Sequence, residues 1–216
     1  MANIKEITIE LISSIGYVAD RLVGIRGKTE IPGKGRVVIG IHGIFGGWTR
    51  QGLYKYLTEH NLKGLLFDFG WQTGKINKYV EKLALEIQKR NIKQPILVGY
   101  SMGGLIAVRY AQKHGWDKVE KMITIAAPFR GSKLAQLIKW LPAGKDMFPE
   151  SDFLKELRKT NPPKGKLVCI VGKWDQFVNK EDLLPGCEKF SIPLGGHTTL
   201  QRYSDNLIPA FDKYLL

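Results

Sequence analysis

Cysteine is scarce in this chain of 216 residues, with only Cys169 and Cys187. Cys169 lies in the apolar run KLVCIVG and Cys187 in the turn-like segment LPGCEK, so no disulfide framework follows. We expect Cys169 to be a small core residue. The four histidines are far apart in sequence and have no metal-ligand spacing. The sequence therefore predicts neither a metal ion nor another cofactor.

Long apolar runs are also missing. The stretch ITIELISSIGYVADRLVGI is interrupted by Glu10, Asp20 and Arg21, whereas a membrane-spanning helix needs about 20 predominantly apolar residues. Glu10 also interrupts the apolar part of a secretory signal, so we expect a cytoplasmic protein, although residues 11–19 leave export open. The spacing indicates an amphipathic helix that packs on the domain or lies on a membrane surface.

Acidic residues are outnumbered by basic ones, 20 to 33, which gives a net charge of +13. The lysines are scattered rather than gathered in a tract, which favours a solvated basic surface and no nucleic-acid partner. Weak association with an anionic membrane surface stays open. The length suits one domain. We expect a monomer in which residues 35–216 form this domain and residues 1–34 form an amphipathic segment that packs on it.

Short apolar runs alternate with segments of helical periodicity along the chain. The runs predicted as strands are 35–43, 62–69, 94–101, 119–128, 166–172 and 187–194. Several are apolar on both faces, as parallel strands covered by helices are. The alternation therefore predicts an α/β protein with a mostly parallel sheet of about six strands and helices on both faces. The tail from residue 198 is expected to be helical, with a kink at Pro209.

A serine stands between two glycines where the third predicted strand turns into a helix, in GYSMGG. Such a turn holds Ser101 in a tight backbone conformation in which a side chain at Gly99 or Gly103 would clash. The pattern Gly-x-Ser-x-Gly alone is weak evidence in a glycine-rich chain. The residues at the same edge of the sheet decide whether this pattern marks a catalytic serine.

Other polar residues follow the ends of neighbouring strands, where sites form in parallel sheets. They lie in the segments HGIFGG (42–47), KWD (173–175) and GGH (195–197). A serine hydroxyl needs a nearby base, and the base needs a third group to orient it. His197 is the only histidine in the last third of the chain. Asp175 is the candidate third group, with Glu181 and Asp182 as alternatives.

Five motifs in order resemble those of the α/β-hydrolase superfamily, and within it the small bacterial serine lipases and esterases. They are HGIFGG, GYSMGG, AAPFRGS, VGKWDQFV and GGHTTL. The chain order Ser, Asp, His also matches that superfamily. The resemblance covers nearly all of the chain after residue 35 and implies the α/β-hydrolase fold. The first 35 residues offer little material for the antiparallel hairpin with which many members begin.

The resemblance implies a role for each candidate. Ser101 would attack an ester carbonyl, His197 would take its proton, and Asp175 would orient the imidazole, giving an acyl-enzyme that water hydrolyses. The backbone N–H groups of Ile44 and Met102 would form the oxyanion hole, with the N–H of Phe45 less suited to it. Two further residues near the edge, His42 and Asp68, are interpreted as structural, although Asp68 could line the site.

Aromatic side chains near the active edge are predicted to line the substrate pocket. They are Phe45, Trp48, Phe129, Trp174 and Phe177. Residues 127–165 leave room for two short helices only, which predicts little or no lid.

The function that follows is hydrolysis of a small-molecule acyl ester by a serine esterase or lipase. A thioesterase, an amidase or an acyltransferase could use the same triad. The alternative from another class is a noncatalytic protein that binds a membrane or a partner through its basic face. A complete Ser-His-Asp set argues against it, because binding alone requires none of these roles.

Overall fold

A seven-stranded sheet forms the centre of the protein in the computed structural model, which describes residues 4–23, 27–47, 51–179, 181, 183–193, 195–202 and 204–216. The strand order across the sheet is β1-β3-β2-β4-β5-β6-β7. The strands are β1 (Lys28–Ile31), β2 (Lys34–Ile41), β3 (Leu62–Phe67), β4 (Ile96–Tyr100), β5 (Lys121–Ile125), β6 (Leu167–Gly172) and β7 (Glu188–Ile192).

The six predicted strands correspond to β2 to β7, and these six pair in parallel with one another. The seventh strand, β1, was not predicted. It pairs antiparallel with β3 at the edge of the sheet, so the first 35 residues do contribute a strand. Its sequence, KTEI, is short and mostly polar because only Ile31 faces the core. Such an edge strand carries almost no hydrophobic signal.

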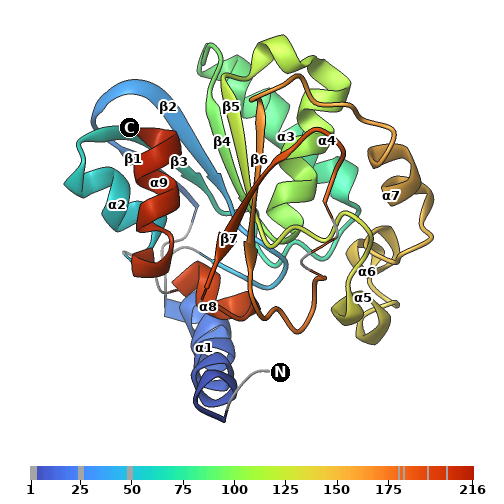
Figure 1. The fold of residues 1–216 in the computed structure, drawn as a ribbon. Helices are drawn as coiled ribbons and strands as arrows, with labels where there is room; N and C mark the ends of the chain where they lie inside the picture. Colours follow the sequence, from blue (N-terminus) through green and yellow to red (C-terminus); the bar gives the residue numbers. More distant parts are fainter. Residues whose placement is uncertain are drawn as a thin grey trace.

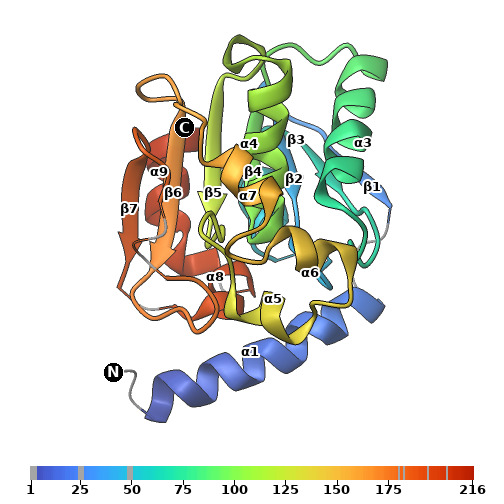
Figure 2. The ribbon, with the colours of Figure 1, turned by 90° about the vertical axis from the view of Figure 1, so that its right-hand side faces the viewer.

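Helices cover both faces of the sheet (Figures 1 and 2). One face carries α3 (Ile76–Lys89), α4 (Met102–His114) and α7 (Asp152–Leu157), and the other carries α2 (Leu53–Glu59), α8 (His197–Arg202) and α9 (Ile208–Leu215). Successive strand residues point to opposite faces, so Ile39 and Ile41 of β2 join one apolar cluster and Val38 the other. Both faces of the central strands are therefore buried, as their apolar sequences require.

The connection between β5 and β6 is more helical than predicted. It contains α5 (Lys133–Leu137), α6 (Pro142–Asp146) and α7, three short helices in place of two. The sequence of α6, PAGKD, has no helical periodicity, and Ala143 and Gly144 are buried by their surroundings. Two 3-10 turns, Trp116–Lys118 and Ser204–Asn206, complete the described elements. Pro209 lies in the first turn of α9 and begins this helix instead of kinking a longer one.

The N-terminal helix α1 (Ile4–Val23) lies apart from both layers, below the carboxyl edge of the sheet and next to α8 (Figures 1 and 2). None of the described helices combines the length and hydrophobicity required to cross a membrane. The helix expected within residues 1–34 is thus present, and it packs where the parallel strands end.

Candidate active site

Ser101 occupies a strained backbone turn between β4 and α4. Its φ is 51° and its ψ is −121°, a region that residues with a side chain rarely adopt. Its N–H donates to the carbonyl oxygen of Ile125 at 2.7 Å. A Cβ at Gly99 would lie 2.5 Å from the carbonyl oxygen of Gly103, so the turn closes only with glycine at that position. The local sequence thus places the hydroxyl of Ser101 at the carboxyl end of β4.

Gly103 brings the first turn of α4 against the end of β2. A Cβ there would lie 2.1 Å from the carbonyl oxygen of Ile41. We expect Gly103→Ala to lower the free energy of unfolding by about 3 kcal/mol, because a backbone atom cannot move aside as a flexible side chain can. Urea denaturation would measure this. Gly165→Ala is the control, since its Cβ meets no atom within 4 Å, and its positive φ should cost only about 1 kcal/mol. Equal losses in both variants would contradict the clash.

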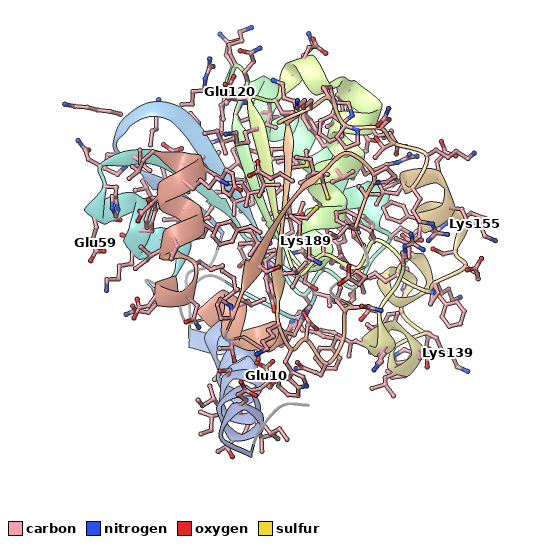
Figure 3. The ribbon with its side chains drawn as sticks, in the orientation of Figure 1. Glu10, Glu59, Glu120, Lys139, Lys155 and Lys189 are labelled. Atoms are coloured by element: carbon pink, nitrogen blue, oxygen red, sulfur yellow. The ribbon has the colours of Figure 1, made fainter. Side chains whose placement is uncertain are left out.

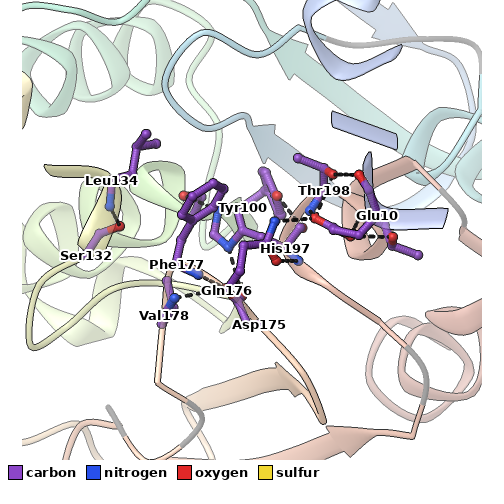
Figure 4. A network of polar contacts seen from close by, with 12 residues as sticks. Glu10, Tyr100, Ser132, Leu134, Asp175, Gln176, Phe177, Val178, His197 and Thr198 are labelled. Atoms are coloured by element: carbon purple, nitrogen blue, oxygen red, sulfur yellow. Dashed lines mark hydrogen bonds and ion pairs between the residues drawn. The ribbon is translucent and has the colours of Figure 1, made fainter. Parts of the chain in front are cut away.

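The Ser101 hydroxyl lies within hydrogen-bond distance of His197. The imidazole of His197 lies in turn within hydrogen-bond distance of Asp175 (Figure 4). The distance from Nε2 of His197 to Oγ of Ser101 is 3.0 Å, and that from Nδ1 to Oδ2 of Asp175 is 2.8 Å. The side chains of all three are largely buried. The other carboxylate oxygen of Asp175 accepts the N–H groups of Phe177 and Val178, both at 2.8 Å, which holds the carboxylate in place.

This geometry can support nucleophilic chemistry at Ser101. With Nδ1 donating to the carboxylate of Asp175, Nε2 is free of a proton and can accept the one from the serine. The structure places Asp175 in this position, whereas Glu181 forms an exposed ion pair with Lys189. Asp182 lies outside the described residues.

The predicted oxyanion donors lie on two neighbouring segments. Met102 is the first residue of α4, where N–H groups have no acceptor within the helix. The loop containing Ile44 follows β2, whose end packs against Gly103 beside the serine turn. The N–H of Phe45 donates to the carbonyl oxygen of Trp71 at 3.0 Å, so this group is already engaged within the loops.

His42 and Asp68 form a buried structural pair. Nε2 of His42 lies 3.3 Å from Oδ1 of Asp68, and this oxygen also accepts the N–H of Gly70 at 2.8 Å. The side chain of Gln72 packs on the same imidazole. These contacts link the loop after β2 to the loop after β3. They engage both ring nitrogens of His42, which favours a structural role over that of the catalytic base.

The predicted pocket aromatics occupy different surroundings. The ring of Phe177 packs edge-on against His197 with 5.3 Å between centroids, and that of Phe45 packs edge-on against Trp71. Trp174 lines a pocket of about 390 Å³ between α1 and the loop before His197. Phe129 is 1% exposed and lies in the apolar core, which does not favour contact with substrate. Trp48 lies outside the described residues.

The sequence predicted no role at the site for Tyr100, Gln176 or Glu10, which surround His197. The hydroxyl of Tyr100 donates to the carbonyl oxygen of His197, and Gln176 accepts its N–H at 3.1 Å. Gln176 in turn contacts Glu10 of α1 (Figure 4). The only signal in the sequence was one acidic residue within an apolar helical stretch, which we interpreted solely as an interruption.

The two cysteines neighbour each other outside this site. Cys169 is buried in the core as predicted. The hydrogen bond between the two thiols lowers the pKa of Cys187 to about 7, and the same bond together with burial raises the pKa of Cys169. In the described part of the chain no group of three histidine, cysteine, aspartate or glutamate side chains could hold a metal ion.

Comparison with known proteins agrees with this architecture. Residues 37–158 match the family model described as alpha/beta hydrolase fold. Because this match spans more than half of the sequence, the chain belongs to the α/β-hydrolase family. No curated protein matches the sequence significantly.

Solved structures with this fold include lipases and other enzymes. The Bacillus licheniformis lipase BlEst2 is 16% identical in its propeptide form, with a TM-score of 0.69 over 87% of this chain and 53% of that one. Its mature form is 17% identical, with a TM-score of 0.66 over 89% and 96%. The Paleococcus ferrophilus monoacylglycerol lipase is 16% identical (TM-score 0.64; 88% and 97% covered). A Bacillus anthracis bromoperoxidase is 20% identical (TM-score 0.63; 87% and 94% covered). At these identities the similarity establishes the fold alone.

Proposed function

We propose that this protein is a serine carboxylic-ester hydrolase whose nucleophile is Ser101. The observation that carries the proposal is the continuous hydrogen-bonded arrangement from Ser101 through His197 to Asp175. Ser101 attacks the acyl carbonyl as His197 takes its proton. His197 then returns this proton to the leaving alcohol, and the acyl-enzyme forms. Water, deprotonated by the same imidazole, releases the acid. The N–H groups of Ile44 and Met102 stabilise the oxyanion in both steps.

The test is hydrolysis of p-nitrophenyl esters from acetate to palmitate by the purified protein, with a fluorophosphonate probe as a second measurement. Turnover supports the proposal, and the preferred chain length distinguishes an esterase from a lipase. Labelling of Ser101 without hydrolysis of any ester would instead favour a thioesterase, an amidase or an acyltransferase. Absence of both would contradict a reactive serine.

We also propose that the outer face of α1 lies on an anionic lipid surface. Two polar side chains of this helix, Glu10 and Ser13, are buried, whereas its apolar side chains Leu11 and Ile15 are 62% and 67% exposed. Ile7 and Ile12 extend the same exposed stripe, since residues three or four apart share a helix face. The net charge of +13 complements anionic headgroups, and acyl esters occur in such surfaces.

Binding to vesicles of phosphatidylcholine and phosphatidylglycerol should therefore depend on this face. We expect Leu11→Ser with Ile15→Ser to weaken co-sedimentation at least about tenfold, because each apolar side chain buried in lipid contributes about 1.5–3 kcal/mol. Leu85→Ser is the matched control, since Leu85 is an exposed leucine on α3. Equal binding by both variants, or a dimer that the double substitution dissociates, would contradict a lipid partner.

A further inference from the structure

Glu10 is a buried acidic residue on α1, with only 3% of its surface exposed. It lies at the lower edge of the molecule, where α1 meets α8 (Figure 3). Its carboxylate accepts hydrogen bonds from both N–H groups and both hydroxyls of Thr198 and Thr199. Removing a carboxylate from water is costly unless hydrogen bonds replace the lost hydration. These contacts with the residues just after His197 supply that replacement.

A side-chain amide connects the same carboxylate to His197 itself. Nε2 of Gln176 donates to Oε1 of Glu10 at 2.7 Å, and Oε1 of Gln176 accepts the N–H of His197 at 3.1 Å (Figure 4). A carboxylate can only accept and a backbone N–H can only donate, so the amide has a single workable orientation. The arrangement therefore fixes Gln176 as well as the backbone of His197.

The backbone at Gly196 approaches the carboxylate so closely that a side chain at this position would displace it. A Cβ at this position would lie 2.3 Å from Oε2 of Glu10. The residue immediately before His197 is thus packed against the carboxylate, while the two residues after it donate to it. Glu10 holds the histidine segment from both sides.

We propose that Glu10 is a positioning residue that keeps the imidazole of His197 within hydrogen-bond distance of Ser101 and Asp175. It touches none of the reacting atoms and acts through Gln176 and the backbone of residues 196–199. The consequence for catalysis rests on the proposed function, whereas the effect on the position of His197 does not. Helix α1 is on this view a part of the active-site architecture.

The decisive variant is Glu10→Gln, which keeps the size of the side chain but places an NH2 group against N–H and O–H donors. We expect kcat for p-nitrophenyl ester hydrolysis to fall about 10- to 100-fold with KM nearly unchanged, since small displacements of a catalytic group have effects of this size. Fluorophosphonate labelling of Ser101 should slow by the same factor. Glu120→Gln, on a partly exposed side chain at the opposite edge of the sheet, is the matched control (Figure 3).

Gln176→Leu gives a second way to break the connection, because it leaves the bonds between Glu10 and the threonines intact. It should also reduce kcat, and the double variant should lose no more than Glu10→Gln alone, since both act through one chain of contacts. Losses that multiply in the double variant would point to two independent structural effects and overturn the proposal. Thermal unfolding of each variant identifies any that fails to fold.

A nuclear magnetic resonance measurement separates this proposal from the proposed function. The Nδ1–H proton of His197, bonded to Asp175, should give a low-field signal in the wild type that is lost or shifted in Glu10→Gln and retained in Glu120→Gln. If the signal responds in this way but no ester is hydrolysed and Ser101 is not labelled, the positioning role holds and the ester-hydrolase function fails. An unchanged signal and an unchanged labelling rate in folded Glu10→Gln would refute the positioning role.

Discussion

Replacing Ser101 by alanine is expected to reduce ester hydrolysis by at least about 10⁴-fold, because no other group takes over the covalent step when the nucleophile is lost. The side chain is largely buried and bonded only to the imidazole of His197 among the contacts described above, so the fold should survive. The measurement is kcat/KM for the best p-nitrophenyl ester, together with the thermal midpoint.

The control for this variant is Ser191→Ala, which removes an exposed hydroxyl from β7 and should leave the rate unchanged. A Ser101→Ala protein that retains more than about a tenth of the activity would show that another group is the nucleophile. This result would refute the proposed function.

Asp175→Asn has the second largest expected effect, a loss of about 10⁴-fold in kcat. The oxygen of asparagine can still accept the N–H groups of Phe177 and Val178, so the turn should persist. Its NH2 group then faces Nδ1 of His197, which must become an acceptor. The proton moves to Nε2, and the imidazole can no longer take the proton of Ser101.

The matched control is Asp117→Asn, which alters an exposed carboxylate paired with Lys118. Steady-state kinetics of both variants and a circular dichroism spectrum suffice for the comparison. Near-wild-type activity in Asp175→Asn would indicate that a different group orients the imidazole.

Elements with strong local patterns were predictable. The runs around Ile39, Val98 and Ile123 are apolar, and the six predicted strands form the parallel part of the sheet. β1 and α6 were missed because their sequences have no periodicity of their own and are held in place by partners distant in sequence.

Part of the candidate site was likewise predictable from the sequence, and part was not. The glycines around Ser101 encode its turn locally, and the edge of a parallel sheet brings the segments containing Asp175 and His197 near to it. The sequence was enough to propose these three side chains. It could not choose among the aromatics, because Phe129 and Phe177 follow strands alike, and only packing separates the buried ring from the one against His197.

By itself, the sequence determined the α/β class, the strained serine turn and the order of the candidate residues, because each depends on neighbours along the chain or on alternation that repeats every few residues. The tertiary structure alone decided how α1 docks and what Glu10 contacts. That carboxylate meets Thr198 across 188 positions of sequence. A buried carboxylate on a helix reverses the usual pattern, and the hydrogen-bond donors that satisfy it come together only in the folded protein.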